Sequence, residues 1–572
     1  MSAASTGRAR SALIAAALFL LSAAFTLWQN ARVAVLWDLS YLLDTSFRIS
    51  LGQLPYRDFP FAHAPLTFLL HAALIKLFGR AYLPHILCAT LEAGLATLLT
   101  WRILLHQLKP LANRSLIATL LAAPLVFLGI YGIYPHPIYD SDCILAVLLA
   151  LTLLQRATHS APRNALAGAA CVLPLFFKQN IGLPFLLITL AAVVILVIAR
   201  RLQRASLAPQ IWFFTGAAAA LAANLLLIHT TVGLHNYIAW TVTFAAQRRL
   251  PGITLILAIY RQSSLLWTLP AALIALVLLR RQGSGAPSMA QSHRDMGGMR
   301  RRLVAFLLLA APFLCTVVSL AINTDPSDRA GQLLSLWPHL LILATVLAVY
   351  NLRPSLLLSN PSLNPLLPLI LLATIHGAFL SQQLWGSTYA LWPLLMLLIA
   401  ALLTQIPTIA RPLAVVISAT FLLCGALYAT SHERLSYIHL DGPLARATLP
   451  ELRGLATPGP WLPAFEELIR TTNSDIPSND AILLLPGDIP FYFATGRTPR
   501  FPVLLFDPAT NPYTPQQILA QSHARNVRWL IVSRNLQLTA PPSPDLPDIL
   551  RTLQPDFTLV RALPNYDIYR RN

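Results

Sequence analysis

The stretch VLWDLSYLLDTSFRISLGQLPYRDFPFAHAPLTFLL, residues 35 to 70, places a polar, acidic loop directly after the first strongly apolar segment of the chain. Asp38, Asp44, Arg57, Asp58 and His63 all lie in it. Charged groups beside a bilayer core are costly and usually serve a function. We therefore interpret this stretch as an active-site loop. The alternative is an ordinary solvated loop whose charges only set the topology.

The composition indicates a polytopic membrane protein. The 572 residues are 56% hydrophobic and 11% charged, whereas about 25% of an ordinary soluble chain is charged. The formal net charge of +19 would suggest nucleic-acid binding in a soluble protein. Here the basic residues cluster between apolar segments, as they do on the cytoplasmic side of membrane proteins. We therefore expect a membrane and no nucleic acid as partner; the clusters lie at 102–114, 200–204 and 280–302.

The acidic residues are distributed unevenly. Thirteen of the 22 follow Thr430, and the topology predicted below places most of the others on the outer face, the exceptions being Glu92 and Asp295. Glu92 falls within a predicted span, where it is either functional or a protonated packing residue. The five cysteines lack metal-ligand spacing, so neither a disulfide framework nor a zinc site is predicted.

We predict about thirteen membrane spans, with the N-terminus in the cytoplasm and the C-terminus outside. The first apolar run resembles a signal peptide, but we interpret it as a retained anchor. The predicted spans are Ser11–Gln29, Tyr82–Trp101, Ser115–Tyr134, Asp140–Gln155, Ala165–Phe177, Ile181–Ala199, Gln210–Thr230, Ser263–Leu279, Leu303–Ile322, Leu336–Tyr350, Leu363–Leu380, Trp385–Thr404 and Pro412–Thr430.

The apolar run Pro65–Phe78 is interpreted as an interfacial or re-entrant helix in the first outer loop. It is shorter than the roughly 20 residues that a span needs. If it crossed, the later basic clusters would fall outside, against the charge rule.

A second domain begins after the last span, so we divide the chain into residues 1–430 and 431–572. The pattern after Thr430 predicts a small outer α/β domain. Its expected helices are Leu462–Thr472 and Thr514–Ala524, and its expected strands are Ala481–Leu485, Trp529–Ser533, Phe557–Val560 and Tyr566–Tyr569.

Acids and cations meet on the predicted outer face. Asp140 and Asp142 form an Asp-x-Asp that could share a divalent cation such as Mg²⁺ or Mn²⁺, or supply a base. A solvated helix start explains the same acids equally well. The cations on this face could bind a lipid phosphate or simply contact headgroups; they are Arg57, His63, Lys178, Arg248 and Arg249.

The first loop resembles that of the GT-C superfamily, the polyprenyl-phosphate-sugar-dependent glycosyltransferases that include the protein mannosyltransferases and aminoarabinose transferases (family 39 type). The matching residues are Trp37-Asp38, Gly52, Pro55-Tyr56-Arg57-Asp58-Phe59, Pro65 and Lys76-Leu77-Phe78-Gly79. The chain departs from the pattern in having Asp38-Leu39 where many relatives have Asp-Glu, and His63-Ala64-Pro65 where they have Lys-Pro-Pro.

The resemblance implies a GT-C-like helical domain and an inverting hexosyl- or pentosyltransferase of the cell envelope, located in the inner (plasma) membrane. Its donor would be a polyprenyl-phosphate-linked sugar and its acceptor a glycan, lipid or protein. Asp38 would be the catalytic base, and Asp142, rather than Asp140, would match the acid of the second loop. Substrate binding would involve Tyr56, Arg57, Asp58, His63 and Lys178.

Two other classes of function are considered. A transporter or lipid flippase would use the proline-containing spans as gated helices; it predicts polar groups at mid-membrane and an internal repeat. A non-catalytic scaffold would present the C-terminal domain, but it leaves the acidic loop unexplained.

Overall fold

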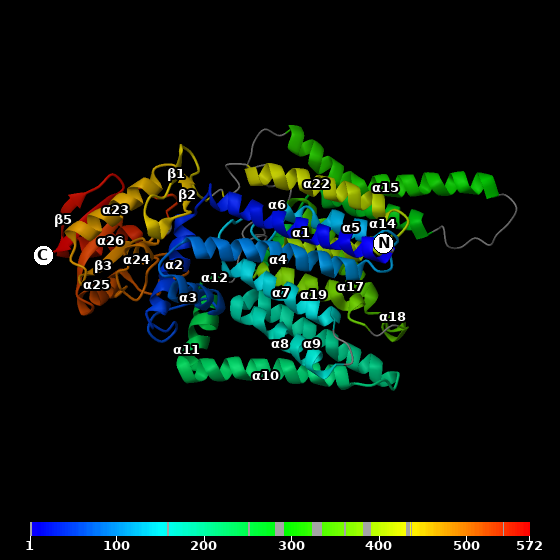
Figure 1. The fold of residues 1–572 in the computed structure, drawn as a ribbon, viewed down its shortest axis with the longest axis horizontal. Coiled ribbons are helices and arrows are strands. Elements are labelled where there is room, and N and C mark those ends of the chain that lie inside the picture. The colour runs from blue at the N-terminus through cyan, green and yellow to red at the C-terminus, as the bar shows by residue number, and fades with distance from the viewer. Residues whose placement is uncertain are drawn as a thin grey trace.

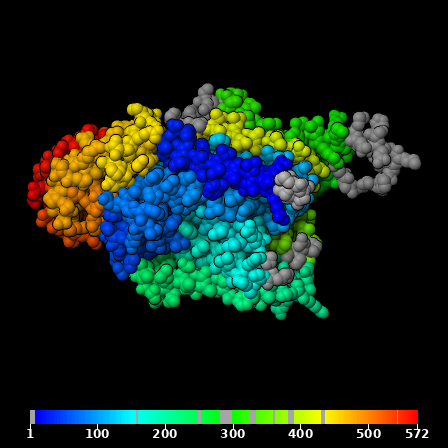
Figure 2. Space-filling model, viewed as in Figure 1, coloured from blue at the N-terminus to red at the C-terminus, as the bar shows by residue number. Residues whose placement is uncertain are grey.

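The computed structural model describes residues 3–156, 160–249, 252–280, 291–322, 334–359, 362–380, 390–430, 435, 437–541 and 543–572. A long body of helices carries a smaller lobe of strands and helices at one end (Figure 1). In the space-filling view, the orange and red lobe lies against the surface formed by the blue first loop (Figure 2). This arrangement confirms the predicted helical membrane domain with a small C-terminal α/β domain.

The helices of the body follow the predicted segments closely. They are α1 (Ala3–Asn30), α2 (Leu36–Ser50), α3 (Leu66–Phe78), α4 (Leu83–Gln107), α5 (Arg114–Ala122), α6 (Leu125–Leu128), α7 (Tyr139–Arg156), α8 (Ala161–Phe177), α9 (Gln179–Leu202), α10 (Ala208–Thr231), α11 (Leu234–Ile238), the π-helix η1 (Ala239–Phe244), α12 (Ala245–Arg249), α13 (Ile253–Ile256), η2 (Leu257–Tyr260), α14 (Leu265–Arg280), α15 (Gln291–Ile322), α17 (Leu336–Asn351), α18 (Pro354–Ser359), η3 (Asn364–Leu366), α19 (Leu367–Ala378), α21 (Trp392–Leu403) and α22 (Ala410–Thr430).

Six helices in the described ranges are long and apolar enough to cross a membrane, namely α1, α4, α9, α10, α15 and α22. Shorter apolar helices stand at most of the other predicted spans. The continuous span predicted at Ser115–Tyr134 was wrong: α5 ends at Ala122 and α6 ends at Leu128. Pro124 has no N–H with which to continue the α5 hydrogen bonding. Trp385, Asp325 and Asp328 lie outside the described residues.

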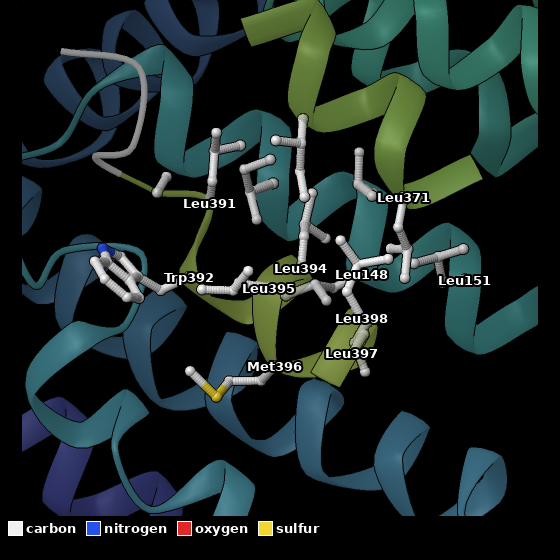
Figure 3. Packing of buried hydrophobic residues seen from close by; sticks show 14 of the residues in the cluster. Leu148, Leu151, Leu371, Leu391, Trp392, Leu394, Leu395, Met396, Leu397 and Leu398 are labelled. Atoms are coloured by element: carbon white, nitrogen blue, oxygen red, sulfur yellow. The ribbon is translucent and has the colours of Figure 1, made fainter. Parts of the chain in front are cut away.

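Helix α21 forms the centre of the body. It is apolar on every side, and Trp392 to Ala401 are all buried. A helix with no polar face is buried in protein or lipid; here its leucines meet Leu148 and Leu151 of α7 and Leu371 of α19 (Figure 3). Neighbouring helices, α7 and α19 among them, therefore cover α21 (Figure 3).

The lobe contains a four-stranded sheet in the order β3-β4-β6-β5, in which only β3 and β4 are parallel. All its predicted strands and helices are present. The elements are β1 (Leu444–Arg446), η4 (Pro450–Leu452), β2 (Ala456–Pro458), α23 (Trp461–Asp475), β3 (Ala481–Leu485), α24 (Phe491–Thr495), α25 (Pro515–Ala524), β4 (Val527–Ser533), α26 (Leu546–Leu553), η5 (Gln554–Asp556), β5 (Phe557–Ala562) and β6 (Tyr566–Arg571).

The first loop joins the body to this lobe. Its helix α2 buries Leu36, Leu39, Leu43 and Phe47 in one cluster with apolar residues of the lobe. These positions recur every three or four residues, which places them on one face of a helix. Helix α3 lies beside α2 at the lobe end of the body, as Figure 1 shows.

Candidate functional site

The candidate base Asp38 lies on the half-buried face of α2. Asp38 and Tyr41 are three residues apart, so they share this face, and both are half-buried. The hydroxyl of Tyr437, in the connection to the lobe, donates to Oδ2 of Asp38 at 2.7 Å. The carboxylate thus stands at the junction of body and lobe without being fully enclosed.

A row of rings connects α2 to the start of α7. The Tyr41 and His63 rings lie 5.3 Å apart between centroids, and His63 stacks on Tyr139 at 4.6 Å. On the other side, the ammonium of Lys178 lies 5.0 Å from the centre of the Tyr139 ring. The first loop, the start of α7 and the turn between α8 and α9 therefore converge.

A cavity of about 340 Å³ opens at this point; we call it the loop-end cavity. Its polar lining comes from His63, Tyr139, Lys178, Gln179, Asn180, Tyr237 and Thr241. The rest of the lining is largely apolar. Its larger members are Leu175, Phe176, Leu183, Leu225 and Val242, from α8, α9, α10 and η1, and Leu380, which follows α19. The cavity is therefore amphipathic, with a cation at its polar end.

Lys178 and Asp140 form a buried ion pair in this site. Their exposed fractions are 6% and 4%, and a buried charge needs such a partner to offset its desolvation. An ammonium group carries three donors, so the contact with Asp140 leaves donors for a ligand. The pair holds the cation in place and also neutralises its charge.

Asp142 does not join Asp140. Its Oδ2 accepts a hydrogen bond from Oγ1 of Thr67 on α3 at 2.5 Å. Both acids lie on α7, where residues two apart point in nearly opposite directions. The Asp-x-Asp motif is thus split between Lys178 and Thr67.

A metal ion does not fit this arrangement of donors. One carboxylate of the motif is paired with Lys178 and the other faces Thr67. Among the residues that the structure describes, no three His, Cys, Asp or Glu side chains are grouped so as to hold a metal ion. The divalent cation remains a sequence prediction, and no step below uses it.

The Tyr56-Arg57-Asp58 segment shapes the loop rather than lining the cavity. Tyr56 is buried with φ of +67°, and its hydroxyl donates to the carbonyl of His63 at 2.6 Å. Arg57 donates a hydrogen bond to Asp58 at 2.8 Å, and the Arg57 side chain is 52% exposed. This hydrogen bond holds the pKa of Asp58 below its ordinary value.

Sequence reasoning assigned no role to Asp44 and Arg48, which bind α2 to the lobe. Asp44 accepts hydrogen bonds from the backbone N–H groups of Tyr492 and Phe493, at 3.2 and 2.7 Å. Burial raises the pKa of the Asp44 carboxyl to about 8, although these N–H groups lower it. Arg48 is buried and donates to the carbonyl of Pro502 at 2.9 Å.

Two polar residues after Lys178 were also missed. The side chain of Gln179 donates to the carbonyls of Ala62 and Thr241, at 2.9 and 3.2 Å, and so joins the first loop to η1. Asn180 donates to the carbonyl of Gly377 at 3.0 Å. The polar triplet Lys-Gln-Asn between two apolar runs was the available signal. Glu92 accepts a hydrogen bond from the Tyr131 hydroxyl at 2.5 Å and also shares a side-chain hydrogen bond with Asp142, so it contacts a predicted site residue. The side chains of Arg248 and Arg249 lie outside the described part.

No family model and no curated protein matches the chain. Among solved structures, it is similar to ArnT from Cupriavidus metallidurans bound to undecaprenyl phosphate, with 13% identity over 99% of this chain and 98% of that chain and a TM-score of 0.45. It is also similar to the oligosaccharyltransferase AglB from Archaeoglobus fulgidus in complex with an inhibitory peptide and a dolichol-phosphate, with 11% identity over 91% of this chain and 69% of that chain and a TM-score of 0.40. At these values the likeness assigns no activity to this chain.

Proposed function

We propose that this chain is an inverting membrane glycosyltransferase of the GT-C superfamily, which transfers a sugar from a polyprenyl-phosphate donor to an acceptor at the face that carries the lobe. The observation that carries the proposal is the loop-end cavity, where a buried cation stands at the head of an apolar slot. The row of rings leads from this cation to α2 and its half-buried Asp38. Sequence resemblance in the first loop supports the same function.

The cavity suits a lipid phosphate. Its apolar walls can accept part of a prenyl chain, and the remaining donors of Lys178 can bind phosphate oxygens by charge-assisted hydrogen bonds. His63 lines the same cavity as Lys178, and in our proposal it takes the place of a second cation. Undecaprenyl phosphate, which ArnT binds, and dolichol-phosphate, which AglB binds, are suitable probes.

The chemistry then needs a base and a stabilised leaving group. Asp38 takes the proton of the acceptor hydroxyl as its oxygen attacks the anomeric carbon. The bond from that carbon to the phosphate oxygen breaks on the opposite side, so the configuration inverts. The lipid phosphate leaves with the electron pair, and Lys178 stabilises the charge that develops on it.

The remaining predicted residues have supporting roles in this proposal. Asp142, which accepts a hydrogen bond from Thr67, positions the acceptor. Tyr56, Arg57 and Asp58 fix the loop that carries His63. Nothing in the described residues favours the transporter or scaffold alternatives. We place the protein in the inner (plasma) membrane with the lobe outside, because the basic clusters gather at the other end of the helices.

The test is a turnover assay with the purified protein, radiolabelled polyprenyl-phosphate sugars and a membrane extract as acceptor source. We expect release of free polyprenyl phosphate with at least one sugar, and competition by undecaprenyl phosphate. If no donor of the panel turns over and undecaprenyl phosphate does not bind, the proposal fails.

A further inference from the structure

A second cavity, of about 260 Å³, lies at the opposite end of the same helices; we call it the far-end cavity. Its polar lining residues are His106, Gln155, Asn164, Arg200, Gln210, Ser362 and Asn364. The apolar lining includes Leu151, Leu154, Val193, Leu196, Phe213, Leu363, Leu367 and Ile370. The proposed reaction makes no use of this cavity.

The two cavities are separated by about the thickness of a bilayer. Helix α9 begins at Gln179 in the loop-end cavity and reaches Arg200 in the far-end cavity. At 1.5 Å per residue, this length of helix spans roughly 30 Å, which matches the hydrocarbon core of a membrane. The far-end cavity therefore lies at the level of the headgroups of the other leaflet.

Several buried polar atoms of this lining have no hydrogen-bond partner. They are Nε of Arg200, Nδ1 of His106, Nε2 of Gln155 and Oε1 of Gln210. Gln210 is only 8% exposed. Buried polar groups are nearly always hydrogen-bonded, because leaving one unpaired destabilises the protein. Such atoms gathered around one cavity indicate a ligand that supplies the partners.

The charges around the cavity select an anion. Arg200 lines it, and no acidic residue is among its described lining residues. Further arginines lie exposed close by in the sequence, at positions 156, 163, 201 and 204. Basic residues at a membrane surface attract anionic lipids.

The wall formed by α8 and α10 is held by close backbone contact. A Cβ atom at Gly168 would lie 2.0 Å from the carbonyl oxygen of Phe213, and one at Gly216 would lie 1.9 Å from that of Ala165. Glycine alone permits this approach. Asn164, Gln210 and Phe213 are thereby placed around the cavity as parts of a fixed wall.

We propose that the far-end cavity binds the headgroup of an anionic phospholipid that carries a hydroxyl, of the phosphatidylglycerol type. Arg200, Gln155 and His106 bind the phosphate oxygens, and Oε1 of Gln210 accepts a hydrogen bond from the headgroup hydroxyl. The acyl chains lie along the exposed apolar surface of α9 and α10, which includes Ile198, Leu202, Ile211 and Trp212. This site does not depend on the proposed reaction.

The experiment is native mass spectrometry of the full-length protein, delipidated in detergent and then offered phosphatidylglycerol, phosphatidylcholine or soluble glycerol 3-phosphate. We expect retention of phosphatidylglycerol in preference to the other two. Arg200→Met should lower the occupancy about ten-fold, the effect of losing a charge-assisted hydrogen bond. The matched control is Arg201→Met, at an exposed neighbour that does not line the cavity, and it should retain the lipid.

Gln210→Met provides an independent readout. This variant should bind phosphatidylglycerol no better than phosphatidic acid, whose headgroup lacks the glycerol hydroxyls, whereas the wild type should prefer phosphatidylglycerol. Equal retention of phosphatidylcholine, an equal loss in Arg201→Met, or equal binding of glycerol 3-phosphate would each overturn the proposal. The last result would make the cavity a site for free anions.

Discussion

Each cavity has a cation at its end of α9: Lys178 is buried and Arg200 is half-buried. The two cations differ in whether the protein supplies a counterion. At the loop end, Lys178 is paired with Asp140 inside the protein. At the far end, Nε of Arg200 has no partner, and no acid is among the described lining residues. A cation that is paired with an acid of the protein has a moderate affinity for a phosphate group. Moderate affinity suits a substrate or product that must dissociate. A cation without such a partner favours a ligand that stays. This difference is the basis on which we propose a turnover site at the loop end and a resident-lipid site at the far end.

Loss of the base should have the largest effect on the loop-end site. Asp38→Asn keeps the size of the side chain but removes its proton affinity, so transfer should fall about a hundred- to ten-thousand-fold. The donor-turnover assay measures the rate, and binding of undecaprenyl phosphate should persist. The matched control is Asp441→Asn, at an exposed acid of the connection to the lobe. Near-normal transfer by Asp38→Asn would place the base elsewhere.

Loss of the loop-end cation comes next. Lys178→Gln should weaken the binding of undecaprenyl phosphate by about ten- to a hundred-fold, because a charge-assisted hydrogen bond is removed. Lys76→Gln, at an exposed lysine of α3, should bind normally. Since the single variant leaves Asp140 buried without a partner, Lys178→Gln/Asp140→Asn is the second variant. If the double variant binds the phosphate as well as wild type does, Lys178 does not bind the donor.

The contact between α2 and the lobe should depend on pH. Burial raises the pKa of Asp44 from 3.8 to about 8, so the folded chain holds this proton more tightly than the unfolded chain. The contribution to stability is therefore largest below pH 4 and is lost as the pH rises from about 4 to about 8, by at most about 1.4 kcal/mol per pH unit. Thermal unfolding in detergent at pH 5 and pH 8 measures it. Asp44→Asn should flatten this dependence; an unchanged pH slope would show that Asp44 does not cause it.

The smallest effect is expected at the exposed Arg57–Asp58 pair. Arg57→Gln should leave the melting temperature unchanged within error, because exposed ion pairs add little to stability. The same variant tests the predicted role in substrate binding through the KM for the donor. A rise in KM at constant kcat would support that role, whereas a large loss of thermal stability would contradict the exposed position of the pair.

Much of the fold could be predicted from the sequence because lipid imposes long apolar helices. The strands Ala481–Leu485 and Trp529–Ser533 were also recognisable from their apolar runs, and both are present. Pro124 signalled a helix break, but we predicted one continuous span because the apolar run is long enough to cross a membrane. Helix α2 was hidden because its apolar face covers the lobe, a partner some 400 residues away in sequence.

The site was harder to predict because the partner of an acidic side chain depends on the direction in which that side chain points, and not only on its spacing in the sequence. Asp140 and Asp142 look like one motif, yet a helix turns them toward different partners. Asp38 and Asp44 look alike in the loop, yet one is half-buried and the other accepts backbone hydrogen bonds from the lobe. Arg200 looked like an ordinary basic residue near a membrane surface. Only the packing of the helices that line the cavity shows that the Nε atom of Arg200 lies there without a hydrogen-bond partner.

Gln537 of the lobe adds a polar contact to the apolar and ionic contacts that join the lobe to the first loop. Its side chain donates to the carbonyl of Ala34 and accepts from the N–H of Leu36, at 2.8 and 2.9 Å, directly before Asp38. Under the proposed function, the binding of an acceptor that shifts the lobe would be thermodynamically coupled to the binding of the donor, and each would change the affinity for the other by the same factor. The affinity measured for each substrate alone would then differ from its affinity in the ternary complex. The position of the lobe would determine which substrate binds first.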